Sequence, residues 1–382
     1  MIRRMWLWGT AHAVDDLYQG LVPASLPYFV LERHYGYVAA SGLTMAAALG
    51  SSVPQPLLGV LADRYRMGWL AAAGVATAGI GLGLAGLAPT YALVWTLILI
   101  SGLGVAMFHP AAGKAAREAA GDSASAMSIF AAGGKVGFFL APVLATPVLV
   151  QVGVPGTVLF IPPAVLIGFV LLRHQRRTVK TGQATAPLGY DRWLPFATLT
   201  GVEVLRSMTF FGMNTFIELY WIRYLHAGKA AAGAALACFL AGGLAGTLLG
   251  GRIADRFGMV RTTQFGALIA IPMLAALRLA TGPVLPLAAA VAAGVALNIP
   301  FAVLVKLGQD YLPSRPGTAA GVTLGLAVSI GGLIAPVLGV IAQHRGPQGV
   351  LTVLVATPAL ALLLGLALPE PSRDQVVAAQ VG

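Results

Sequence analysis

The sequence predicts an all-helical membrane protein built from two related halves, and three observations lead to this fold class. The pattern Gly-x-x-x-Asp-Arg at 59–64 recurs at 251–256, displaced by 192 residues. With 58% hydrophobic residues, 10% charged residues and a mean hydropathy of +0.83, the chain has too few charges to cover a soluble protein of 382 residues. Long apolar segments recur throughout, so we expect lipid to cover most of its surface.

Six segments of the first half approach the roughly 20 mainly apolar residues that a spanning helix needs. The first contains His12, Asp15 and Asp16, which argue against a cleavable signal peptide, so we expect it to be retained as a helix. The second ends at the repeated pattern, and the sixth ends before Arg173. The predicted spans are 5–31, 37–61, 68–88, 91–113, 123–151 and 155–172.

The second half supplies six further segments that parallel the first six. The Gly104–Pro110 motif of the fourth span returns as Gly294–Pro300 in the tenth, and Gly137–Pro142 of the fifth returns as Gly331–Pro336 in the eleventh. The predicted spans are 193–224, 230–250, 260–280, 284–307, 316–343 and 348–368. We therefore expect twelve transmembrane helices as two pseudo-symmetric six-helix bundles, 1–172 and 193–382, joined by a cytoplasmic linker at 173–192.

The positive charges set the orientation in the membrane. A net charge of +11 would suggest a nucleic-acid partner in a soluble protein, but here 17 Lys and Arg residues lie in one alternate set of loops and 5 in the other. Because positive loops stay inside, we expect a multi-pass protein of the cytoplasmic (inner) membrane with both termini and the linker in the cytoplasm. We expect no nucleic-acid partner.

This arrangement of spans, linker and twin Gly-x-x-x-Asp-Arg loops resembles the major facilitator superfamily over the whole chain. Four motifs resemble, more narrowly, the fosmidomycin-resistance type of drug exporter. They are His12-x-x-Asp15-Asp16, Gln55-Pro56-x-x-Gly59, Phe108-His109-Pro110 and Gln309-Asp310-Tyr311, with Gly331-Gly332. The resemblance implies proton-coupled efflux of a small molecule, with the loop charges gating the transporter. The implied gating residues are Asp63, Arg64, Asp255 and Arg256.

The chain departs from the family pattern at three positions. Asp15 and Lys135 stand where the family has Asn, and Arg66 stands where the first loop has Gly. The two changes inside the membrane are charge-complementary, which predicts an Asp15–Lys135 pair. Lys135 facing the cavity and binding an anionic substrate is an equal alternative. The resemblance thus implies the transport fold and leaves the substrate open.

Charges inside predicted spans need a reason, because each costs at least about 2.5 to 3.5 kcal/mol at the bilayer centre. On the first helix His12, Asp16 and Gln19 share one stripe, while Asp15 and Tyr18 lie about 100° around it. Burial and mutual repulsion of the adjacent carboxylates favour proton binding, so Asp16 and Asp15 are the first candidates for proton coupling. Structural ion pairs are the alternative.

A second group of candidates lies on other spans. His109 and Asn298 lie close to prolines within their helices, where packing is the alternative role. Glu203, Arg206 and Asn214 share one helical face, on which the first two can pair locally. Glu218 and Trp221 lie nearer the external end, where we expect interface anchors, with a ligand site as the alternative. The predicted proton-coupling residues are Asp16, Asp15, Glu203 and His109, and the predicted substrate-binding residues are His12, Gln19, Tyr18, Lys135, Arg206, Asn214 and Asn298.

These patterns predict a transporter and not an enzyme. The chain has no Walker-type loop, and its single cysteine, Cys238, and scattered histidines show no metal-ligand spacing, so a proton gradient and no cofactor is expected to supply the energy. We expect a monomeric proton-coupled antiporter that exports a small amphiphilic, zwitterionic or anionic organic compound by alternating access. The alternatives are a proton-coupled uptake symporter for a small organic acid or metabolite and, more remotely, a non-transporting membrane sensor or assembly factor.

Overall fold

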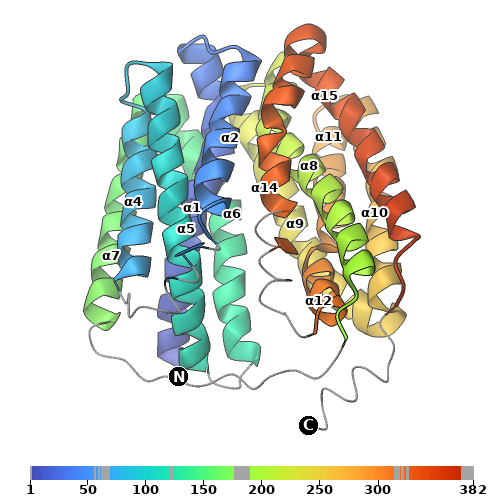
Figure 1. Ribbon diagram of the computed structural model, residues 1–382. Coiled ribbons are helices and arrows are strands. Elements are labelled where there is room, and N and C mark those ends of the chain that lie inside the picture. The colour runs from blue at the N-terminus through green and yellow to red at the C-terminus, as the bar shows by residue number, and fades with distance from the viewer. Residues whose placement is uncertain are drawn as a thin grey trace. The chain divides into compact units, whose positions relative to one another are not determined.

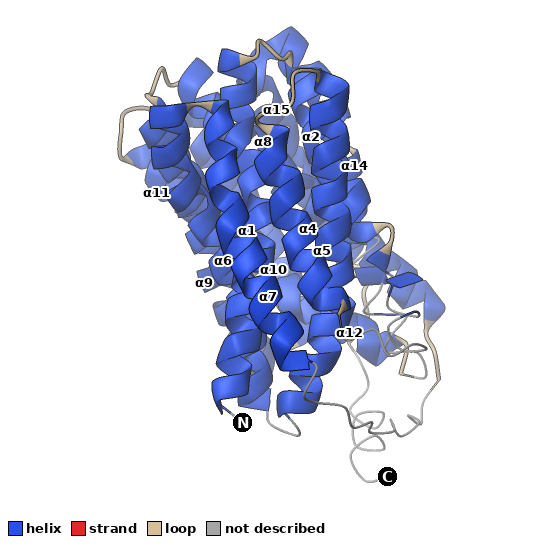
Figure 2. Cartoon of the chain, turned by 90° about the vertical axis from the view of Figure 1, so that its left-hand side faces the viewer, coloured by secondary structure: helices blue, strands red, loops and turns tan. Residues whose placement is uncertain are grey.

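The structure is a computed structural model that describes residues 2–55, 57–58, 61, 69–120, 124–175, 190–313, 319, 322–323 and 327–370. All regular secondary structure in these residues is helical, as Figure 2 shows, which confirms the predicted all-helical class. Seven of their helical segments are long and apolar enough to cross a membrane. Two further helices of 31 residues, one starting at Ile2 and one at Trp193, carry the buried charges discussed below.

The helices of the first half follow the predicted spans closely. Proline at 110, 142 and 147 lies inside long helices, where neighbouring helices can satisfy the freed carbonyl groups. The elements are α1 (Ile2–Glu32), α2 (Tyr37–Ser52), α4 (Leu70–Ala85), α5 (Tyr91–Ala120), α6 (Ala124–Val152), the 3₁₀ helix η1 (Val154–Phe160) and α7 (Ile161–Gln175).

The second half shows two breaks with clear causes. The predicted tenth span is divided at Pro300, which cannot donate a backbone hydrogen bond, and α15 changes direction at Gly346, whose φ is +70°. The elements are α8 (Trp193–Arg223), α9 (Lys229–Phe257), α10 (Met259–Leu279), α11 (Leu285–Asn298), α12 (Phe301–Tyr311), α14 (Ala327–Leu333) and α15 (Ala335–Gly365). The count of twelve spans remains a prediction.

The chain divides into two compact units. Unit 1 contains Met1–Gly182, Ala227–Ala237 and Ala335–Gln343, and unit 2 contains Gln183–His226, Cys238–Ile334 and His344–Gly382. The bundle and linker boundaries expected from the sequence remain predictions.

In unit 1, α1 lies beside α6 and α5 (Figure 1). Small residues bring α1 and α6 together, because a side chain on Gly133 would meet the backbone of Gly9 and one on Gly137 would meet that of Ala13. Below this contact Trp8 and Phe108 are buried in a shared apolar cluster. Polar groups on α1 are therefore held at short range from α5 and α6.

In unit 2, α8 packs against α14 and α12, and α10 packs against α11. Gly331 of α14 lies directly against Ser207 of α8, where a larger side chain would collide with the backbone. Phe196 and Leu199 of α8 join Leu304 of α12 in the apolar core of this unit. These contacts hold α8, and with it the polar residues on one of its faces, in a fixed position within unit 2.

The junction of α9 and α10 explains one residue of the repeated loop pattern. Gly258 has φ +96° and ψ 156°, a conformation available almost only to glycine. The next turn is capped by Glu370, whose Oε1 accepts a hydrogen bond from the Val260 amide at 3.1 Å. The corresponding first loop, at 62–68, lies outside the described residues.

Candidate functional site

Unit 1 brings four titratable side chains together, which we call the His–Asp cluster: His12, Asp15 and Asp16 of α1 and His109 of α5. His12 Nε2 lies 3.4 Å from Asp16 Oδ2, and His109 Nε2 lies 3.3 Å from Asp16 Oδ1. His109 Nδ1 lies 3.5 Å from Asp15 Oδ2. One carboxylate is therefore placed between two imidazoles, and the second carboxylate borders one of them.

The cluster is removed from solvent on its α1 side. Asp15 is 0% exposed, Asp16 8% and His12 9%, while His109 is half-buried. Both oxygens of Asp15 and Oδ1 of Asp16 have no hydrogen-bond partner among the described residues. A buried carboxylate without donors is costly, and a proton on the carboxyl group or on a neighbouring imidazole reduces that cost.

The backbone fixes the orientation of both imidazoles. His12 Nδ1 lies 2.8 Å from the Phe130 carbonyl oxygen, and His109 Nδ1 lies 3.0 Å from that of Val105. Since a carbonyl only accepts, each Nδ1 carries a hydrogen, and each Nε2 is left facing Asp16. A further proton on either Nε2 turns a repulsive contact between a lone pair and an oxygen into a charge-assisted hydrogen bond. The arrangement can therefore bind and release protons.

Aromatic rings and a glycine enclose the cluster. The His12 ring stacks on Phe130 with centroids 4.3 Å apart, and the His109 ring meets Phe108 edge-on at 5.8 Å. Gly134 of α6 has no side chain, which leaves room for His12 and Asp16. A Cβ at this position would lie 2.7 Å from His12 Nε2 and collide with Asp16 Oδ2. The missing side chain is what allows α6 to approach the two polar groups.

Three side chains of the cluster also have the spacing of ligands in a divalent-cation site. One possible ligand atom from each of His12, Asp16 and His109 lies within 4.8 Å of the others. Sequence reasoning expected no metal-ligand set, because α1 and α5 contribute residues that are distant along the chain. However, the two imidazoles face different oxygens of Asp16, as two separate N–H···O contacts do. The geometry fits protons on the imidazoles directly.

Three other predicted site residues of unit 1 lie on α1 and α6. The Tyr18 hydroxyl donates to the Phe160 carbonyl oxygen at 2.7 Å, and its side chain is fully buried, which favours a packing role. Gln19 and Lys135 are half-buried. The Asp15–Lys135 pair stays a prediction, since the ion-pair geometry found for Asp15 is with His109.

In unit 2 the predicted local pair on α8 is present. Arg206 donates from Nε to Glu203 Oε2 at 2.7 Å and from Nη2 to Oε1 at 2.6 Å, and both side chains are buried. The guanidinium carbon lies 4.8 Å from the centre of the Phe301 ring. The bidentate geometry satisfies Glu203 internally. The coupling and substrate roles predicted for the two residues stay predictions.

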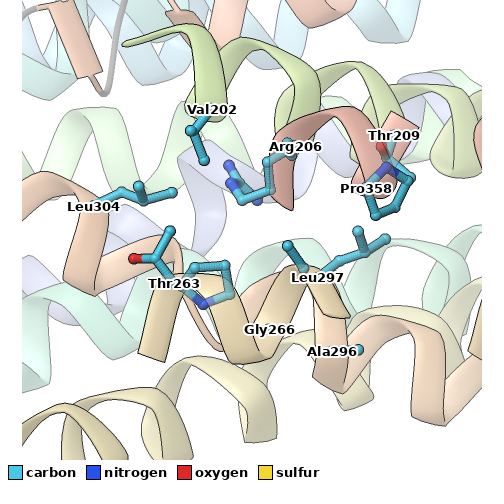
Figure 3. Close-up of a pocket in the computed structure, with 12 residues that line it drawn as sticks. Val202, Arg206, Thr209, Thr263, Gly266, Ala296, Leu297, Leu304 and Pro358 are labelled. Carbon is cyan, nitrogen blue, oxygen red and sulfur yellow. The ribbon is translucent and has the colours of Figure 1, made fainter. Parts of the chain in front are cut away.

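Arg206 also borders a pocket that the sequence did not predict. Figure 3 shows the side chain among Val202, Leu304 and Leu297, which line the pocket. Its lining is almost entirely apolar, with Thr263 at one side. The residues that line the pocket come from α8, α10, α11, α12 and α15, so no single segment of the sequence predicts it.

The remaining polar residues of the unit 2 helices differ in how well they are satisfied. Asn298 Nδ2 donates to the Gly294 carbonyl oxygen at 2.9 Å, and Asn214 Nδ2 donates to that of Phe210 at 2.8 Å. Asn214 Oδ1 and both oxygens of Glu218 are buried without a hydrogen-bond partner among the described residues.

The expectation that Glu218 and Trp221 anchor the external interface is wrong, because these side chains are only 1% and 3% exposed. Distance from the helix end suggested exposure, whereas burial depends on neighbouring helices that the local pattern does not specify. Glu218 lies four residues after Asn214, so its place on the same helical face was visible in the sequence.

The predicted gating residues are only partly described. Asp255 and Arg256 are exposed at the end of α9, and the Arg256 guanidinium carbon lies 5.4 Å from the Phe257 ring centre. Asp63 and Arg64 lie outside the described residues. The gating role therefore stays a prediction.

Comparison with known proteins connects this geometry to transport. The model of the Major Facilitator Superfamily matches residues 9–336 and 199–380. An uncharacterised MFS-type transporter of Bacillus subtilis, YfnC, is 28% identical over 380 residues and is matched over 96% of this chain and 92% of its own length. The fosmidomycin resistance protein of Escherichia coli is 26% identical over 371 residues, covering 92% of this chain and 89% of its own length.

Solved structures show the same fold at low sequence identity. A bacterial homologue of the human lysosomal transporter Spinster, in an inward-facing and occupied conformation, has a TM-score of 0.80 at 16% identity and covers 100% of this chain and 97% of its own. A D-xylose–proton symporter has a TM-score of 0.75 at 13% identity and covers 96% of this chain and 97% of its own.

Proposed function

Given that the chain belongs to the major facilitator superfamily, we propose that it exports a small amphiphilic, zwitterionic or anionic organic compound in exchange for protons, by alternating access and as a monomer. Its family and relatives are transporters, so the chain is a multi-pass membrane transporter. The drug-resistance relative supports the outward direction of this proposal.

The observation that carries proton coupling is the His–Asp cluster. Each imidazole can donate from Nε2 to Asp16 only when that nitrogen bears a proton, and His109 Nδ1 lies 3.5 Å from Asp15 Oδ2. In our proposal, a proton from outside loads the cluster, and its release to the cytoplasm leaves the carboxylates without donors. In this proposal Asp16, Asp15 and His109 are the proton-coupling residues, and His12 takes part in proton binding with them.

The energy of such an exchange is sufficient for export. When one proton is exchanged for a compound of zero net charge, moving that charge through 100 mV supplies about 2.3 kcal/mol, which corresponds to a substrate gradient of roughly fiftyfold before any pH difference is added. When the compound carries one net positive charge, the exchange moves no net charge and the pH difference supplies the energy. A single bound proton at the cluster can thus drive accumulation outside the cell. No other energy source is required by the proposal.

The mixed sign of the polar side chains supports the substrate class. Lys135 and Arg206 supply positive charge, and Glu203 accompanies Arg206 in its pair. Gln19 adds a neutral hydrogen-bonding group in unit 1, and Asn214 and Asn298 add two in unit 2. A molecule with both an apolar part and a charged part suits this set better than a simple cation.

The direct test is a thermal-shift screen of metabolites and antibiotics on the purified full-length protein at two pH values. A substrate should stabilise the wild type in a pH-dependent way, and Asp16→Asn should remove the pH dependence. Asp310→Asn, which removes an ion-paired carboxylate from α12, is the matched control and should behave as the wild type.

Direction and coupling are then read in proteoliposomes. Export in exchange for protons predicts that substrate added on the cytoplasmic side drives protons the opposite way, whereas the symport alternative predicts movement in the same direction. Proton-coupled flux that survives unchanged in Asp16→Asn would refute the assignment of the cluster.

A further inference from the structure

Three acceptor oxygens on consecutive turns of α8 have no donor in the part of the chain that the structure describes. They are Oδ1 of Asn214 and both carboxyl oxygens of Glu218, and the two residues are 3% and 1% exposed. Since α-helical residues four apart are neighbours on one face, the three atoms belong to a single patch. We call Asn214 and Glu218 the acceptor patch.

Such a patch is unfavourable unless something donates to it. A buried polar group without a hydrogen bond costs about 1–3 kcal/mol, and an unpaired charge costs more. Asn214 donates one of its two Nδ2 hydrogens to the Phe210 carbonyl oxygen, and its Oδ1 is left without a donor among the described residues. The Arg206 side chain, three turns earlier on α8, is already held by Glu203. A ligand that brings its own N–H donors would satisfy the acceptor oxygens, for which the described residues provide none.

An aromatic pair lies one helical turn before this patch on α8. Phe210 is one turn before Asn214 and half-buried, and its ring centre lies 6.0 Å from that of Phe239 on α9. Aromatic rings beside oxygen acceptors suit a ligand with an apolar body and a donating, positively charged end.

We propose that Asn214 and Glu218 bind the primary ammonium group of the transported compound. An ammonium group offers three N–H donors and one positive charge, which match three acceptor oxygens and one carboxylate. This inference rests on the proposed transport function and names a chemical feature of its substrate. The His–Asp cluster in unit 1 carries protons, and the acceptor patch in unit 2 reads the substrate.

The test uses the full-length protein in detergent, without any gradient, and phenethylammonium as the probe. Its neutral isostere, 2-phenylethanol, has the same apolar body without the charge. Isothermal titration should show binding of the amine in preference to the alcohol, and Glu218→Gln should weaken amine binding at least about tenfold. Asn214→Ala should weaken it less, and the control Asp310→Asn should leave it unchanged.

A second variant keeps the experiment informative if Glu218→Gln does not fold. Glu218→Asp retains the charge and should bind the amine more weakly than the wild type while still preferring it to the alcohol. Loss of that preference in a folded Glu218→Asp protein overturns the proposal.

Three other results would also overturn it. They are equal binding of amine and alcohol by the wild type, unchanged amine affinity in Glu218→Gln, and stabilisation that depends on Glu218 with sodium ions in place of the amine. Because no proton gradient is present, these results are independent of whether Asp16 couples transport to protons.

Discussion

Gly134 is the residue on which the geometry of the His–Asp cluster depends most directly. We expect Gly134→Ala to reduce proton-coupled transport strongly and to destabilise the protein by about 1–3 kcal/mol, because the new methyl group would occupy the space of Asp16 Oδ2 and His12 Nε2. Thermal unfolding in detergent and transport in proteoliposomes measure the two effects.

The matched control for this substitution is Gly113→Ala on α5, one turn from His109, where a Cβ would meet nothing within 4 Å. Alanine favours a helix over glycine by about 1 kcal/mol, so this variant should be as stable as the wild type or slightly more stable. If both variants transported equally well, the close fit at Gly134 would have no role in coupling.

Asp15 and His109 should be energetically coupled. Removing the imidazole in His109→Ala leaves a fully buried carboxylate without its neighbour, which we expect to cost about 3 kcal/mol. The double variant Asp15→Asn/His109→Ala should be more stable than the sum of the single effects by at least about 1 kcal/mol. Unfolding of the four proteins in a double-mutant cycle gives this coupling energy.

The same cycle with Lys135 decides between two partners for Asp15. Coupling in an Asp15→Asn/Lys135→Met cycle and none in the His109 cycle would assign the carboxylate to Lys135, as the sequence predicts. Coupling in both would place Asp15 between two cations.

At this scale the sequence predicted what lies on one helix. His12 and Asp16 are four residues apart, and their contact at 3.4 Å follows from helical spacing. The approach of His109 from α5, and the two carbonyl groups that orient the imidazoles, depend on how helices pack. That information is distributed over small residues such as Gly9 and Gly133, whose effect is tertiary.

Among the helices, α8 carries both paired and unpaired charged side chains on one face. Glu203 and Arg206 satisfy each other within one turn, while Glu218 near the other end has no donor among the described residues. The spacing of these residues was readable from the sequence, and so was the local pair. The burial of Glu218 was not, because a charge close to a helix end is compatible with either environment.

The junction between α9 and α10 supplies a prediction for an element boundary. Gly258→Ala should destabilise the protein by about 1–3 kcal/mol, because φ +96° with ψ 156° strains any residue that has a Cβ. The added Cβ would also lie 2.6 Å from Glu370 Oε1, whose carboxylate caps α10. Thermal unfolding in detergent tests this.

Gly251→Ala is the comparison for this junction, since Gly251 lies within α9 and a Cβ there would meet nothing within 4 Å. It should not lower the unfolding temperature. An equal loss of stability in both variants would mean that general helix perturbation, and not backbone strain at Gly258, is responsible.

For the whole molecule, the repeat and the low charge content indicated the membrane class and family correctly, because both are properties of the entire chain. Boundaries such as the breaks at Pro300 and Gly346 were also marked by residues with a strong backbone preference. The pocket beside Arg206 was not predictable, since it draws on five helices of unit 2. The geometry of the sites therefore depends on helix packing more than the class and the family do, and it is the part that the sequence predicts least.

The distribution of positive charge makes a prediction about the whole chain in its membrane. With 17 Lys and Arg residues in one set of loops and 5 in the other, both termini should lie in the cytoplasm. A green fluorescent protein fused after the C-terminus should fluoresce, and alkaline phosphatase inserted at 280–284, between α10 and α11, should be active because this orientation puts the loop on the outside. The reverse result at both positions would show that the protein has the opposite orientation in the membrane. Protons entering from outside would then meet the opposite ends of α1 and α5.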